Sequence, residues 1–123
     1  MGRQKFIDEV TALGYVTTDL GEGKIHFPFP IFVGPRAGVD VKLGLEIGDD
    51  YPLNPPGGPH FSMALMPINT NGGEHPYASI HPSGPFGPGW QYWSRPLRHW
   101  LQTRQRASDI IAHINRLLET LPP

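Results

Sequence analysis

A stretch rich in proline and glycine, residues 51–93, constrains this chain more than any other sequence feature. Ten of the fifteen prolines lie between positions 51 and 96, and Glu74 is the single residue of 51–93 with a formal charge. Proline fixes φ and has no N–H donor, so most of this stretch is excluded from helix interiors and central strands. We therefore expect packed turns and loops here, with regular structure on either side.

The composition is that of one globular domain covering residues 1–123. The chain has 123 residues, of which 38% are hydrophobic, enough for a single core. Ten basic and eleven acidic residues nearly balance, which argues against a nucleic-acid partner. The sequence has no run of about 18 apolar residues and no apolar signal core at its start, so we expect a cytoplasmic protein without membrane contact.

The chain contains no cysteine. This excludes disulfides, thiolate metal sites and thiol nucleophiles within the sequence.

Periodic patterns predict helices at both ends of the chain and strands between them. Residues 4–13 place apolar side chains at helical spacing, residues 108–121 carry a wider apolar stripe, and a short helix is expected near 97–101. Residues 39–47 alternate strictly between apolar and other side chains, and residues 15–18, 24–32 and 61–66 are weaker strand candidates. The order predicts an α+β fold: an N-terminal helix, a three- to four-stranded antiparallel meander, a Pro-rich flap, and C-terminal helices packed on one face of the sheet.

Three short motifs give this order a family resemblance. They are Tyr51-Pro52-Leu53-Asn54-Pro55-Pro56, His81-Pro82-Ser83 and Trp93-Ser94-Arg95-Pro96. Together they resemble the Tyr-Pro-x-x-Pro-Pro, His-Pro-Asn and Trp-Ser-Pro elements of the ubiquitin-conjugating (UBC-like) superfamily, including its inactive variants and RWD domains. The segment from Trp90 to Arg95 and the long last helix resemble the bacterial branch, so the resemblance implies a UBC/RWD-like fold.

The resemblance also implies that the usual nucleophile is missing. In active members a cysteine lies eight positions after the asparagine of His-Pro-Asn, which corresponds to Gln91 here, and Ser83 stands in place of that asparagine. A carboxamide cannot form a thioester. We therefore expect no catalytic residue and no enzymatic activity, and a scaffold retained for binding.

The expected binding residues lie on and after this flap. They are His81, Ser83, Phe86, Trp90, Gln91, Trp93, Arg95 and Arg98. Whether the tryptophans belong to the core or to an interface stays open, and the arginines are either a solvated helical face or a docking site for an acidic partner surface. The first motif is expected to be structural, through Tyr51, Pro52, Pro55 and Pro56.

The leading functional hypothesis is a non-catalytic partner or scaffold in a bacterial ubiquitin-like conjugation pathway. It would bind the modifier or its activating or conjugating enzyme, with a heterodimer as one arrangement, and no cofactor or metal is expected. One alternative is an enzyme of another class that uses a metal held by His75 and His81, although no compact ligand spacing supports it. A hydrolase built on His81 and Ser83 lacks an evident acidic partner, and an adaptor for peptides unrelated to ubiquitin is a further alternative.

Overall fold

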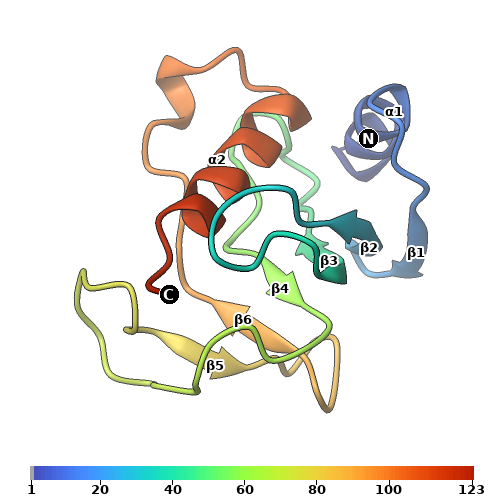
Figure 1. The fold of residues 1–123 in the computed structure, drawn as a ribbon. Helices are drawn as coiled ribbons and strands as arrows, with labels where there is room; N and C mark the ends of the chain where they lie inside the picture. The colour runs from blue at the N-terminus through green and yellow to red at the C-terminus, as the bar shows by residue number, and fades with distance from the viewer. Residues whose placement is uncertain (1) are drawn as a thin grey trace.

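The computed structural model describes residues 2–123 and has an α+β architecture with two α-helices and one antiparallel sheet (Figure 1). The helices are α1 (Gly2–Ala12) and α2 (Ala107–Glu119), and a single 3₁₀ turn, η1 (Trp100–Gln102), precedes α2. The strands are β1 (Thr18–Gly21), β2 (Lys24–Pro30), β3 (Asp40–Glu46), β4 (His60–Phe61), β5 (Ile80–Pro82) and β6 (Gln91–Trp93). They lie in the order β1-β2-β3-β4-β6-β5, and every neighbouring pair is antiparallel.

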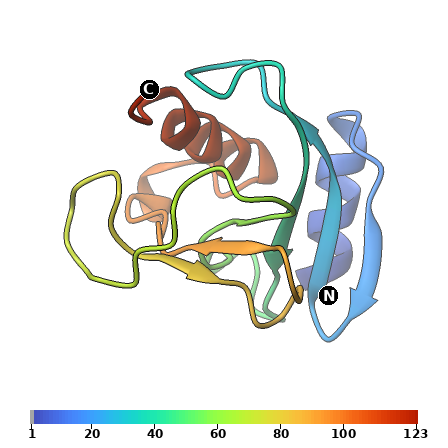
Figure 2. The same cartoon turned by 60° about the horizontal axis from the view of Figure 1, so that its bottom comes forward.

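Six strands replace the three or four expected from the sequence. The predicted strand at 61–66 is reduced to β4, and β5 and β6 form a hairpin inside the Pro-rich region (Figure 2). The first strand also lies later than expected, because Glu22 and Gly23, both with positive φ, make the turn that pairs β1 with β2.

The expected helix at 97–101 is not an α-helix. Only η1 forms there, since Trp100 turns inward and its Nε1 donates a hydrogen bond to the carbonyl of Pro52 at 2.8 Å. The C-terminal helices of the prediction are therefore one α-helix and one 3₁₀ turn.

The core lies between the two helices and one face of the sheet. Phe6 and Val10 of α1 and Ile110 and Ile114 of α2 are buried in the same cluster as the inward residues of β2 and β3. In both helices these residues are four apart, which places them on one face. No helix of residues 2–123 is long and apolar enough to cross a lipid bilayer.

Glu9 joins α1, α2 and the turn at position 51. Its Oε1 accepts hydrogen bonds from the Tyr51 hydroxyl and, at 2.9 Å, from the backbone N–H of Ala107. Burial alone would raise the pKa of Glu9, but these bonds, together with Lys5, lower it below its ordinary value. The carboxylate is therefore the stable form, and it stabilises the fold above the pKa of an unfolded glutamate and ceases to do so as pH falls.

Replacing Glu9 with alanine is expected to reduce the free energy of unfolding by about 2 kcal/mol, because a buried hydroxyl and a helix-start N–H lose a charged acceptor. Urea unfolding at pH 7 measures the change. Asp8→Ala is the matched control, since Asp8 is exposed and accepts a hydrogen bond from Gln4 within its own helix. Equal effects of the two variants would contradict the bridging role of Glu9.

Candidate functional site

The flap, residues 81–91, lies on the sheet face opposite the helices. The strand register aligns five residues in one row across β2, β3, β4, β6 and β5, namely His26, Gly44, His60, Tyr92 and His81. Their neighbours in the strands, such as Phe27, Leu43 and Phe61, are buried against the helices. Because side chains alternate along a strand, the row projects to the other side, under the flap.

Phe86 packs the flap against the middle of this row. Its ring lies over Gly44, where an added Cβ would come within 2.8 Å of two ring carbons. The ring stacks on Trp90 with centroids 4.9 Å apart and lies 4.7 Å from the ring of His60. Trp90 in turn lies 5.7 Å from His26. These rings, of which His60 is buried and the others are half-buried, form a second apolar layer. We call it the flap cluster: His26, His60, Phe86, Trp90 and Tyr92.

Ser83 is buried and ties the flap to His60. The Ser83 Oγ lies 2.8 Å from Nδ1 of His60 and accepts a hydrogen bond from the N–H of Phe86 at 3.2 Å. Burial lowers the pKa of His60 to about 4, so this imidazole is neutral at pH 7. The Ser83 side chain, which the sequence analysis expects to contact a partner, is buried and bonded inside the protein.

The order Ser83, His60, Glu46 invites comparison with a hydrolytic triad. The His60 Nε2 lies 3.8 Å from a Glu46 oxygen, too far for a hydrogen bond. Ser83 is 4% exposed, and its Oγ already accepts the N–H of Phe86. This geometry holds the flap and leaves no open approach to a nucleophile, so the three residues are assigned a structural role.

Gln91 faces the helices, not the solvent. Its Oε1 accepts hydrogen bonds from the N–H groups of Leu65 and Met66 at 3.1 and 3.3 Å and from the Trp93 indole at 3.2 Å. Its Nε2 donates to the carbonyl of Met66. The Gln91 side chain, which the sequence analysis expects to contact a partner, is therefore buried and holds residues 65–66 from inside the protein.

Trp93 belongs to the core. It is 1% exposed, and its ring lies 4.6 Å from that of Phe61 on the helix side of the sheet. The alternative left open by the sequence is thus resolved differently for the two tryptophans. Trp93 is interior, whereas Trp90 is half-buried on the flap.

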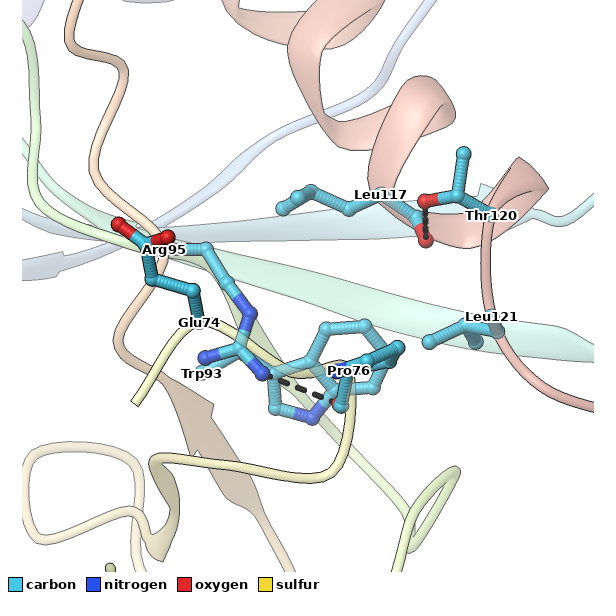
Figure 3. Close-up of a pocket in the computed structure, with 7 residues that line it drawn as sticks. All are labelled: Glu74, Pro76, Trp93, Arg95, Leu117, Thr120 and Leu121. Carbon is cyan, nitrogen blue, oxygen red and sulfur yellow. Dashed lines mark hydrogen bonds between the residues drawn. The ribbon is translucent and has the colours of Figure 1, made fainter. Parts of the chain in front are cut away.

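Arg95 and Arg98 lie apart from the flap cluster. Arg95 bonds through its guanidinium to the carbonyls of Pro76, Ala78 and Ser94, and burial lowers its pKa. Figure 3 shows it beside a cavity of about 210 Å³ that also contacts Trp93 and the end of α2. Arg98 is exposed and lines an adjoining cavity. The eight expected binding residues therefore divide between a flap surface, a separate groove and the interior.

The first motif makes contacts of a structural kind. Tyr51 is buried, with its ring edge-on to Phe6 at 5.6 Å and 6.0 Å from Trp100. Pro56 is buried, Pro52 and Pro55 are half-buried, and the Tyr51–Pro52 peptide bond is cis.

The sequence reasoning did not place His26 and His60 at the flap. Their positions in β2 and β4 became informative only once the register placed them in one row. The pair proposed for a metal, His75 and His81, does not form a site: no group of three potential metal ligands comes together within residues 2–123.

Comparisons with protein-family models, with curated proteins and with solved structures found no match to this chain. The interpretation of the site therefore depends on its geometry and on the motifs of the sequence.

Proposed function

We propose that the chain is a non-catalytic, UBC-like binding domain that acts in a bacterial ubiquitin-like conjugation pathway. The observation that carries this proposal is Gln91: at the position where the resemblance places a thiol, the chain has a buried carboxamide held by Leu65, Met66 and Trp93. The element order supports the kinship, since a helix, an antiparallel sheet, the Tyr51-Pro52 turn, a flap and a final helix follow one another as the resemblance implies. The sheet has six strands, more than the three or four expected.

The binding surface of this proposal is the outer side of the flap. His81, Phe86 and Trp90 are half-buried there, and together they offer aromatic area on a segment fixed to the sheet. Rigid aromatic groups lose little conformational entropy on binding, which suits them as anchors for a protein partner. The partner is the modifier or its activating or conjugating enzyme, and the enzyme supplies the catalytic thiol.

Binding can be tested with a bacterial ubiquitin-like protein and with the activating and conjugating enzymes that act on it. Isothermal titration calorimetry should detect at least one complex, and Trp90→Ala should weaken it at least about tenfold while reducing the free energy of unfolding by only about 1–2 kcal/mol, since the ring is partly exposed.

The control for this test is Phe32→Ala. Phe32 is 81% exposed and lies outside the flap, so its replacement should leave both affinity and stability unchanged. If none of the candidate proteins binds the wild-type chain, or if Phe32→Ala weakens binding as much as Trp90→Ala, the proposal fails.

A further inference from the structure

Two adjoining cavities form a groove between the 73–76 loop and the second half of α2. One lobe, of about 210 Å³, is lined by apolar groups of Trp93, Leu117 and Leu121 and by Pro76. The other, of about 310 Å³, is lined by Ser94, Arg98 and His113 among others. Three residues line both lobes, namely Glu74, Arg95 and Leu117. The groove thus has an apolar end and a polar, basic end.

Arg95, at the junction of the two lobes, forms no ion pair within residues 2–123. The Arg95 guanidinium donates to three backbone carbonyls, which fix its position without neutralising it. Within residues 2–123, no carboxylate lies within 4 Å of it. Figure 3 shows the guanidinium directed toward Pro76, with Glu74 on the same side of the cavity and Leu117 and Leu121 across from them.

His113 lies at the polar end of the groove. Its Nε2 lies 2.9 Å from the carbonyl oxygen of Arg95, which fixes the ring beside that residue. Arg98 is exposed at the same lobe. A carboxylate in this lobe would meet two arginines and a histidine, and a side chain attached next to it would reach the apolar lobe.

We propose that this groove binds the C-terminal end of a peptide whose last residue is apolar. The free carboxylate lies at Arg95 and Arg98, the last side chain enters the lobe formed by Trp93, Leu117 and Leu121, and the preceding residues leave past the 73–76 loop. Among residues 2–123, Glu74 is the one acidic residue that lines the groove, and it weakens binding by repelling the carboxylate. This site is separate from the flap and does not depend on the kinship proposed above.

The probe is acetyl-Gly-Ser-Gly-Leu with a free carboxylate, compared with its C-terminal amide and with the same peptide ending in glycine. Titrations followed by ¹H–¹⁵N NMR should shift the Trp93 indole and the amides of Arg95, Leu117 and Leu121. The free acid should bind about tenfold more tightly than either comparison peptide, because one lacks the charge and the other the apolar side chain. Binding of N-acetyl-leucine without binding of the peptide would overturn the assignment to a peptide terminus.

Substitutions at two exposed residues should change the affinity for the free acid in opposite directions. Glu74→Gln should tighten binding of the free acid about threefold, and Arg98→Gln should weaken it about threefold, as exposed charges do. Arg104→Gln is the control, since Arg104 is exposed and lines neither lobe. Equal affinity for the acid and the amide, no shifts at the groove, or no effect of either variant would overturn the proposal.

Discussion

Replacing Gln91 with alanine is expected to reduce the free energy of unfolding by about 4 kcal/mol, a large effect for one side chain. The side chain is 3% exposed and satisfies the N–H groups of Leu65 and Met66, the carbonyl of Met66 and the indole N–H of Trp93. Alanine leaves all four groups in an apolar interior without these bonds, and it also leaves a void. Urea unfolding followed by tryptophan fluorescence measures the midpoint and slope.

Gln102→Ala serves as the control for this experiment. Gln102 is exposed in η1, and its replacement should change stability by no more than about 0.5 kcal/mol. If Gln91→Ala reduced the free energy of unfolding by less than about 1 kcal/mol, the role of Gln91 in holding residues 65–66 would be contradicted.

A cysteine placed at position 91 tests the orientation of this site in another way. The side chain at 91 points into the core, so the thiol of Gln91→Cys should react with a soluble disulfide reagent far more slowly in the native state than in urea. Rapid reaction of the folded variant would show that position 91 reaches solvent, as a conjugating nucleophile must.

The second large effect is a loss of stability in acid that depends on His60. Burial lowers the pKa of this histidine from 6.5 to about 4, so the unfolded chain binds the proton more readily than the folded one. Protonation of His60 therefore has little effect on the free energy of unfolding above pH 6.5. As pH drops from 6.5 to 4, the free energy of unfolding falls. The lost free energy is about 3 kcal/mol at pH 4, by linkage.

The effect of His60 is isolated by difference. Between pH 7.5 and pH 4, the free energy of unfolding should fall by about 3 kcal/mol less in His60→Asn than in wild type. Asparagine can still form a hydrogen bond with Ser83, but it does not titrate. Glu46, 3.8 Å from Nε2 but half-exposed, favours the protonated ring and acts against the shift. His26, whose pKa burial and Lys42 also lower, remains in both proteins. Identical pH dependence of unfolding in wild type and His60→Asn would contradict the role assigned to His60.

The elements with strong local periodicity were predictable from the sequence. The alternation at 39–47 and the apolar stripe at 108–121 correspond to β3 and α2, and the 4–13 pattern to α1. In each case a single segment encodes which face is buried, so the pattern is visible without its neighbours. The α+β class followed from the order of these segments.

The short strands were not predictable, because tertiary partners define them. β4, β5 and β6 have two or three residues each, too few for a period to appear. At 61–66 the apolar composition favoured a strand, but the N–H groups of Leu65 and Met66 bond to the Gln91 side chain instead of to a neighbouring strand. A side chain 25 residues away cannot be inferred from local pattern.

The same limit applies to the candidate site. The motifs located the flap, but they could not show which of its residues face the helices and which face the solvent. That assignment depends on the β6 register, which places Gln91 opposite Phe61 and Tyr92 opposite His60. A shift of one residue would reverse the two sets.

The contact between Gly44 and Phe86 also predicts how the two positions vary together in other sequences. Any side chain at position 44 would occupy the space of the ring, so the glycine and the aromatic residue depend on each other across 42 positions. Chains that share this flap should keep both residues or lose both. This paired substitution pattern can identify distant relatives even where the short proline motifs have diverged.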